Sequence, residues 1–169
     1  MQTTMIVLGL LIVAVGIIMF TAKAKMNNIP LVPDNEKVLT LTDKNFQQQT
    51  KNNLVLVDFW ASWCLPCKKS LPYLINYYIN NKDTNLVILA VNVDTDPANF
   101  KKFREKLDSD FPFIVVLDSD NKIVSKYNIE SLPTTIFIDK KGNINKVSVG
   151  FTDDSKQEYT DELAKLLKE

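Results

Sequence analysis

Four apolar runs, separated by segments with helical patterns, limit what this chain of 169 residues can fold into. The runs are Leu54–Trp60, Leu86–Val93, Phe113–Leu117 and Thr134–Ile138. The first two are almost unbroken, which is typical of strands buried on both faces of a sheet. Helical patterns follow them, from about Pro66 to Asn80 and from Asp96, as the cap, to Leu107. Strands that alternate with helices predict a three-layer α/β domain, a central mixed sheet flanked by helices.

The last part of the chain predicts a hairpin and a helix. A short helix is expected over Ile123–Tyr127, and a second strand at Ile144–Val149 follows the turn residues Lys140–Asn143. Ser155 and Glu158 have the spacing of a capping box and predict the start of the last helix. The apolar face of that helix would consist of Tyr159, Leu163, Leu166 and Leu167.

The amino-terminal segment, residues 1–25, is far more apolar than the rest of the chain. Met5–Phe20 is an unbroken run of apolar residues and glycine, and no charged side chain precedes Lys23. With its uncharged neighbours the run supplies about the twenty residues that a membrane-spanning helix needs. An uncleaved membrane anchor is the leading interpretation. A secretory signal cleaved near Ala22–Ala24, or a buried helix, is the alternative.

A linker is expected between this segment and the folded domain. Residues 26–36 contain two prolines and no periodic pattern, so the domain should occupy residues 37–169. Within it, Val38–Leu41 predicts a short edge strand, and Thr42 or Asp43 is expected to cap a helix. The lysines just after the apolar segment favour a cytoplasmic domain by the positive-inside rule, although their excess is small.

Charge and residue types exclude several functions. Twenty Lys and Arg residues balance twenty Asp and Glu residues, and Arg104 is the only arginine. Arginine makes most bidentate contacts to phosphates and bases, so nucleic acid is not expected as a partner. The chain has no histidine, which removes the usual general base and any His-based catalytic triad. Cys64 and Cys67 are the only cysteines, too few for a four-thiolate metal site. We therefore expect no metal and no cofactor.

The two cysteines lie between the first apolar run and the helix after it, in the sequence Trp63-Cys64-Leu65-Pro66-Cys67. Residues at i and i+3 share a face of a helix, so the sulfurs can form a disulfide with little change of the backbone. The helix N-terminus would stabilise the thiolate of Cys64 and make it a nucleophile. Cys67 would then resolve the mixed disulfide. An inert bridge is the alternative, but so short a ring gives little stabilisation.

Two motifs resemble one known family. Val57–Cys67, with the sequence VDFWASWCLPC, closely resembles the active-site strand and helix start of thioredoxins. Further along, Ser131–Thr135 resembles the loop with the family's cis-proline, again just before a strand. Gly142 and Gly150 fall where the family's hairpin and following turn carry glycines. The resemblance covers about residues 37–169 and implies a thioredoxin-like fold.

The resemblance also implies roles for single residues. Cys64 would be the nucleophile and Cys67 the resolving thiol. Pro133 would be a cis residue that faces the disulfide, with an ordinary trans proline as the alternative. Asp58 matches a buried carboxylate beneath Cys67; burial would raise its pKa and suit it to accept a proton, whereas a solvent-facing strand end would not. Trp63 either packs in the core or contacts the partner. The residues expected to contact the substrate are Trp63, Leu65, Pro66, Leu132 and Thr134.

The apolar amino terminus and the inserted segment Asp94–Tyr127 make the chain similar to the membrane-tethered TlpA/ResA-like branch. That branch implies a thiol-disulfide oxidoreductase anchored by a single pass in the bacterial inner (cytoplasmic) membrane, with its domain on the periplasmic or extracytoplasmic side. After signal cleavage it would instead be a secreted periplasmic protein. It would reduce disulfides in exported proteins, cytochrome c precursors included, and a membrane dithiol carrier would re-reduce it. A thiol oxidase and a tethered binding module are the alternatives. The family's active-site lysine falls on Ala90 here, so proton handling would rest on Asp58.

Overall fold

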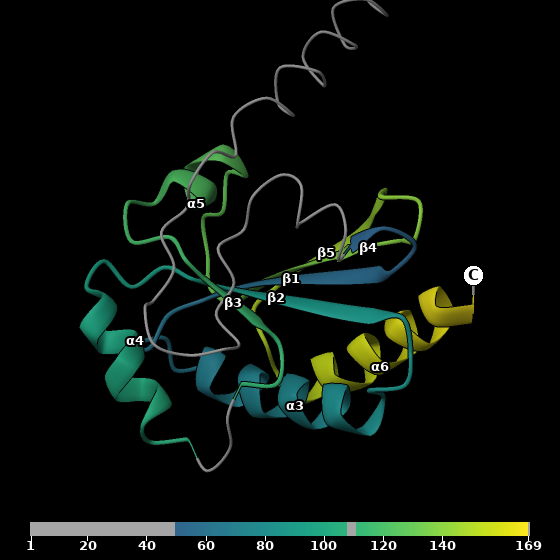
Figure 1. The fold of residues 1–169 in the computed structure, drawn as a ribbon, viewed down its shortest axis with the longest axis horizontal. Coiled ribbons are helices and arrows are strands. Elements are labelled where there is room, and N and C mark those ends of the chain that lie inside the picture. Colours follow the sequence, from purple (N-terminus) through teal and green to yellow (C-terminus); the bar gives the residue numbers. More distant parts are fainter. Residues whose placement is uncertain (1–49, 108–110, 169) are drawn as a thin grey trace, which may run out of the picture.

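The computed structural model describes residues 50–107 and 111–168, which form a five-stranded sheet with helices on both sides (Figure 1). The strands are β1 (Leu54–Trp60), β2 (Leu86–Asn92), β3 (Ile114–Leu117), β4 (Thr134–Ile138) and β5 (Ile144–Val149). The helices are α3 (Cys67–Asn80), α4 (Pro97–Arg104), α5 (Lys122–Lys126) and α6 (Asp153–Lys168). Each expected element in these ranges is present, so the three-layer α/β architecture is confirmed.

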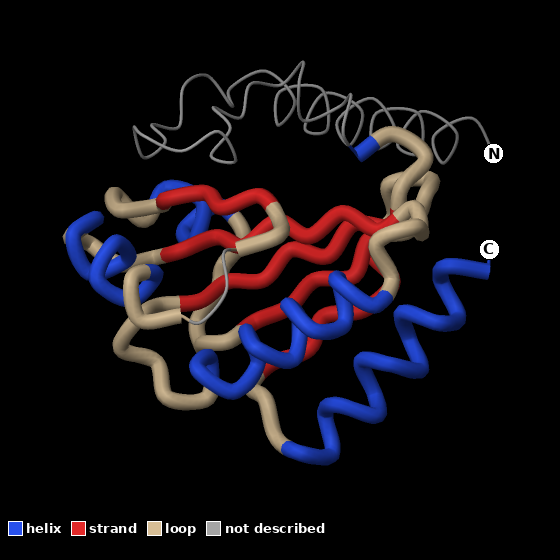
Figure 2. The backbone as a smooth tube through the Cα atoms, turned by 60° about the horizontal axis from the view of Figure 1, so that its bottom comes forward, coloured by secondary structure: helices blue, strands red, loops and turns tan. Residues whose placement is uncertain are grey.

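The sheet is mixed, and its order is β3-β2-β1-β4-β5. β1 pairs in parallel with β2 and β2 with β3, whereas β4 runs antiparallel to β1 and to β5. The carboxyl ends of β1, β2 and β3 therefore meet at one edge of the sheet, and the loop with both cysteines leaves β1 there. Helices α3 and α6 lie side by side on one face (Figure 2), while α5 lies on the opposite side of the sheet.

Aromatic rings hold the helices on the sheet. Trp60, at the end of β1, is fully buried and anchors α4. The rings around it are those of Phe100, Phe103 and Phe111. Tyr159 of α6 is equally buried at the other end of the core. The rings around it are those of Tyr73, Phe137 and Phe151. Burial of such large apolar surfaces supplies most of the driving force for docking the helices.

Helix α4 begins as the sequence predicts and ends earlier. The carboxylate of Asp96 accepts a hydrogen bond from the amide of Ala98 at 2.9 Å, which confirms it as the N-cap. The helix ends at Arg104, so the expectation that it continues to Leu107 is wrong. The last amides turn back by only three residues, for example from Lys106 to the carbonyl of Phe103, a tighter turn that terminates the α-helix.

The predicted cap of α6 is also wrong, because the helix begins at Asp153, two residues before Ser155. Thr152 and Ser155 form the reciprocal pair: the Thr152 amide donates to Oγ of Ser155 at 3.0 Å, and the Ser155 amide donates to Oγ1 of Thr152 at 3.4 Å. Glu158 takes no part in this cap and instead forms an ion pair with Lys146 of β5.

Several predictions fall outside the described residues. They are the membrane segment (residues 1–25), the linker (residues 26–36), the edge strand at Val38–Leu41 and the helix start at Thr42 or Asp43. Within residues 50–107 and 111–168, no helix has both the length and the hydropathy needed to cross a membrane.

Candidate active site

A disulfide joins Cys64 and Cys67 where β1 gives way to α3. The loop after β1 turns at the amide of Cys64, which donates to the carbonyl of Ala61 at 3.1 Å. Pro66 already has helical backbone angles and, with Cys67, starts the helix. The two Cα atoms are 5.2 Å apart, as the spacing in the sequence predicts. The sequence motif thus forms the expected dithiol site at the start of a helix.

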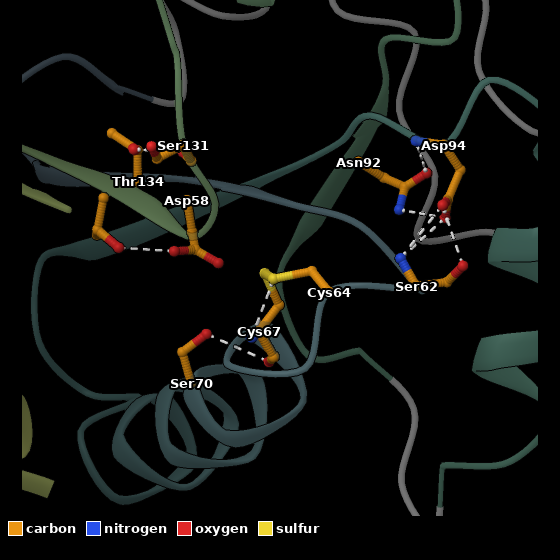
Figure 3. The surroundings of a disulfide bond; sticks show 10 residues. Asp58, Ser62, Cys64, Cys67, Ser70, Asn92, Asp94, Ser131 and Thr134 are labelled. Atoms are coloured by element: carbon orange, nitrogen blue, oxygen red, sulfur yellow. Dashed lines mark hydrogen bonds between the residues drawn. A yellow bond between two sulfur atoms is a disulfide. The ribbon is translucent and has the colours of Figure 1, made fainter. Parts of the chain in front are cut away.

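The two sulfurs differ in their surroundings. Cys67 is completely buried, while Cys64 retains 5% exposure and lines a groove. The amide of Cys67 donates a hydrogen bond to the sulfur of Cys64 at 3.2 Å (Figure 3). Because this amide donates to the sulfur of Cys64 at the positive end of the helix, it would stabilise a thiolate there. The sulfur of Cys64 is therefore placed to react with a partner protein, and the sulfur of Cys67 is placed to attack Cys64 in the second exchange.

Asp58 is fully buried, and the hydrogen bonds from Tyr159 of α6 to Thr135 and from Thr135 to Asp58 place it on the sheet face that α6 covers. Its Oδ1 accepts a hydrogen bond from the hydroxyl of Thr135 at 2.6 Å, and its Oδ2 has no partner among the residues that the structure describes. Burial raises the pKa of Asp58 to about 7, and the Thr135 bond lowers it only in part. The solvent-facing alternative for Asp58 is therefore wrong. Opposite it on β2 stands Ala90, so the neighbouring strand brings no cation to this point.

The loop before β4 adopts the expected cis form at the Leu132–Pro133 peptide. The carbonyl of Pro133 accepts a hydrogen bond from the amide of Gly150 at 2.8 Å. Thr134 is buried, and its hydroxyl donates to the carbonyl of Ser131 at 2.7 Å. Leu132 lines the groove beside Cys64, whereas Thr134 and Pro133 are not part of its lining.

A groove of about 760 Å³ opens beside the disulfide, between the cysteine loop, the end of β2 and the segment that follows α5. Trp63 and Leu65 stand at it with 65% and 74% of their surface exposed, so Trp63 does not pack in the core. The lining residues are Trp63, Cys64, Leu65, Pro66, Val93, Thr95, Asn121, Val124, Ile129, Glu130, Ser131 and Leu132. Four of the five residues expected to contact a substrate are thus brought together; Thr134 is the exception.

The sequence reasoning missed one cluster, at the carboxyl ends of β1 and β2. The buried carboxylate of Asp94 accepts hydrogen bonds from the amide and the hydroxyl of Ser62 and from the side-chain amide of Asn92 (Figure 3). It thereby fixes the loop two residues before Cys64. A usable signal existed, because polar residues that follow neighbouring parallel strands meet at one edge of the sheet.

Comparisons with known proteins agree with this geometry. Residues 24–163 match the Redoxin family. The chain is 36% identical over 123 residues to the thiol-disulfide oxidoreductase ResA of Bacillus subtilis, an alignment that covers 73% of this chain and 64% of the relative. It is 33% identical over 132 residues to ResA of Bacillus cereus, covering 78% of this chain and 75% of the relative. The crystal structure of StoA from Bacillus subtilis matches with a TM-score of 0.55 and 29% identity over 65% of this chain and 84% of that chain.

These matches confirm the thioredoxin-like fold and the similarity to ResA-type proteins. The alignments span 54% to 64% of the full length of the first three relatives.

Proposed function

Because the chain belongs to the Redoxin family, we propose that it is a thiol-disulfide oxidoreductase that works through the Cys64–Cys67 dithiol. The observation that carries the proposal is the disulfide at the start of α3, with one sulfur at a groove and the other buried behind it. The relatives named thiol-disulfide oxidoreductase support it.

In the reductive direction the reaction has two exchanges. The thiolate of Cys64 attacks one sulfur of a partner's disulfide, which forms a mixed disulfide and releases the partner's other sulfur as a thiolate. Cys67 then loses its proton and attacks the sulfur of Cys64. This closes the Cys64–Cys67 disulfide and releases the second partner thiol. The partner gains two electrons, and an external dithiol must return two electrons to the protein.

The chain's own groups support each exchange. The amide of Cys67 and the helix start stabilise negative charge on Cys64. Asp58 has a pKa of about 7, and its Oδ2 has no partner in the part of the chain that the structure describes, so near neutral pH it can take the proton that Cys67 must lose. The exposed side chains of Trp63 and Leu65 offer an apolar surface on which a partner chain can pack.

We further propose that the partners are exported proteins with disulfides, cytochrome c precursors among them, and that a membrane dithiol carrier supplies the electrons. A redox titration against glutathione tests whether the protein reduces the disulfides of its partners or forms them. A potential near about −270 mV supports a reductant, and one near about −120 mV would instead identify a thiol oxidase.

We propose that the domain works outside the cytoplasmic membrane, tethered by the apolar run Met5–Phe20 or released after cleavage. Labelling of the cysteines in intact cells with a membrane-impermeant maleimide, after mild reduction, tests the location. Labelling only after cell lysis would place the domain inside.

The activity itself is tested with cysteine variants and insulin as the disulfide substrate. C64S should lower turnover by about 10³-fold or more, the scale expected when a nucleophile is lost. C67S should also stop turnover but should accumulate a mixed disulfide through Cys64, visible as an adduct that a reductant removes. Unchanged turnover in C64S, in a variant with unaltered circular dichroism, would overturn the proposal.

A further inference from the structure

A row of polar side chains crosses the sheet at the level of Asp58. In the strand register Asp58 of β1 lies opposite Thr135 of β4, which lies opposite Ser148 of β5. All three are buried, and Thr135 accepts a hydrogen bond from α6, so the row lies on the face that this helix covers. Polar groups are rare in a core unless they are bonded, so this row calls for a partner from the helix above it.

Tyr159 of α6 provides that partner. Its hydroxyl, at a fully buried position, donates a hydrogen bond to Oγ1 of Thr135 at 2.7 Å. The hydroxyl of Thr135 donates in turn to Oδ1 of Asp58 at 2.6 Å. A hydroxyl has one proton, so a Thr135 that accepts from Tyr159 is held as a donor toward Asp58. Burial raises the pKa of Tyr159 to about 12, so it keeps its proton across the physiological range.

The chain of hydroxyls gives the two oxygens of Asp58 different roles. Oδ1 is occupied by Thr135, and Oδ2 is without a partner among the described residues. In Figure 3 the carboxyl group of Asp58 lies on the side of the sheet where the disulfide is found. Cys67 of α3 is drawn on that same side in Figure 3, Tyr159 of α6 interacts electrostatically with Asp58, and the neighbour of Asp58 on β2 is Ala90.

We propose that Tyr159 is a positioning residue for proton transfer: it holds Thr135 as a donor to one oxygen of Asp58 and so reserves the other oxygen for the proton of Cys67. In the step itself, the S–H bond of Cys67 breaks and an O–H bond forms at Oδ2, leaving a thiolate on Cys67 and a neutral Asp58. That thiolate then attacks Cys64. The proton transfer from Cys67 to Asp58 rests on the proposed function. The hydrogen-bond arrangement that Tyr159 imposes on Asp58 does not.

The experiment measures the pKa of Asp58 directly. The full chain is labelled with ¹³C at aspartate carboxyl groups, kept in the disulfide form in detergent micelles, and titrated by NMR, with D58N to assign the signal. T135V removes the donor and should raise the pKa of Asp58 by about one pH unit or more, since only the charged form gains from that bond. Y159F should also raise the pKa of Asp58, by a smaller amount. T135S keeps the hydroxyl, so the pKa of Asp58 in this variant should equal that of the wild type.

Two further variants separate this role from a general structural one. Tyr73 also bonds α6 through its hydroxyl, to the carbonyl of Lys156 at 3.0 Å and to the hydroxyl of Thr160 at 2.8 Å. Y73F therefore also removes a tyrosine hydroxyl bonded to another element, here from α3 to α6, and should leave the pKa of Asp58 unchanged. In T135V/Y159F the added effect of Y159F should be much smaller than in the wild-type background, because the hydrogen bond of Tyr159 reaches Asp58 through Thr135.

An unchanged pKa of Asp58 in Y159F would overturn the proposal, as would a shift from Y159F that is just as large when T135V is already present. Because these titrations use the oxidised protein, they do not depend on turnover. If they behave as expected while C64S retains full activity, the proposed function fails and the positioning role survives. With active protein, the pH at which insulin reduction is half-maximal should rise in Y159F and T135V but not in Y73F.

Discussion

The carboxylate of Asp94 accepts hydrogen bonds from Ser62 at the backbone amide, 3.1 Å and 3.2 Å from its two oxygens, and at the hydroxyl, 3.0 Å away. Asp94 follows β2, and Ser62 lies in the loop between β1 and Cys64. The side-chain amide of Asn92 adds a further bond at 2.8 Å. One buried carboxylate therefore ties the reactive loop to the neighbouring strand.

We expect D94A to destabilise the fold by about 3 kcal/mol, because it leaves several buried donors without an acceptor. S62A removes only the hydroxyl bond and should cost about 1 kcal/mol. D96A, which removes the exposed cap of α4 two residues away, is the control and should also cost about 1 kcal/mol. Urea unfolding of the oxidised protein measures all three. A D94A variant no less stable than D96A would show that the loop does not depend on this carboxylate.

The raised pKa of Asp58 predicts how stability depends on pH. In the unfolded chain this group has a pKa near 3.8, and in the fold about 7. Between these values the folded state holds a proton that the unfolded state has lost, so the stability from this group falls as pH rises from about 4 to 7. Relative to D58N, which does not titrate, the wild-type free energy of unfolding should drop by at most about 4 kcal/mol across this window.

Urea unfolding of both oxidised proteins between pH 4 and pH 8 checks this expectation. The substitution itself adds a constant offset, so only the change of the difference with pH carries information. The difference in the free energy of unfolding between the wild type and D58N could instead stay constant with pH, or shift in favour of the wild type as pH rises. Either result would mean that burial does not raise the pKa of Asp58.

Trp63 at the groove should matter for protein partners more than for small disulfides. W63A is expected to lower kcat/KM for insulin about 10-fold, the loss of one well-packed aromatic contact, and to change reduction of oxidised glutathione by less than about 2-fold. Its free energy of unfolding should stay within about 0.5 kcal/mol, because the side chain is 65% exposed. I79A removes an exposed apolar side chain of α3 outside the groove and should change neither rate. Equal losses for both substrates in W63A would assign Trp63 to the chemistry and not to partner contact.

Signals that lie within a short stretch of sequence predicted most of the described fold. Apolar runs gave the strands, and Asp96 before Pro97 marked the start of α4. The spacing of Cys64 and Cys67 placed the dithiol at a helix start. In these cases the physical cause, such as a cap bond or a buried face, involves residues that are neighbours in the chain.

Where two local signals compete, or where partners are distant in sequence, the sequence alone was not sufficient. Thr152 and Ser155 have the same capping spacing as Ser155 and Glu158, and the fold uses the first pair because Glu158 meets Lys146 on β5. Ser62 and Asp94 are separated by 32 positions, and only the parallel pairing of β1 with β2 brings them together.

Tyr159 illustrates a second limit. The helical pattern identified it correctly as a residue of the buried face, since its ring packs in the core. The pattern says nothing about its hydroxyl, whose partner Thr135 lies on a different element 24 positions away. A tyrosine in an apolar stripe carries a polar atom that requires a bonding partner when buried, and that requirement is visible only once the strands are in register.

The groove beside the disulfide also determines how partners arrive. Among its lining residues in the described part of the chain, Glu130 alone carries a charge. Long-range attraction between oppositely charged surfaces normally speeds encounters and makes them sensitive to ionic strength. A groove with so little charge offers little electrostatic steering. Acidic and basic partner proteins should therefore associate with it at similar rates at low and at high ionic strength. Selection among partners then depends on shape complementarity after the first contact.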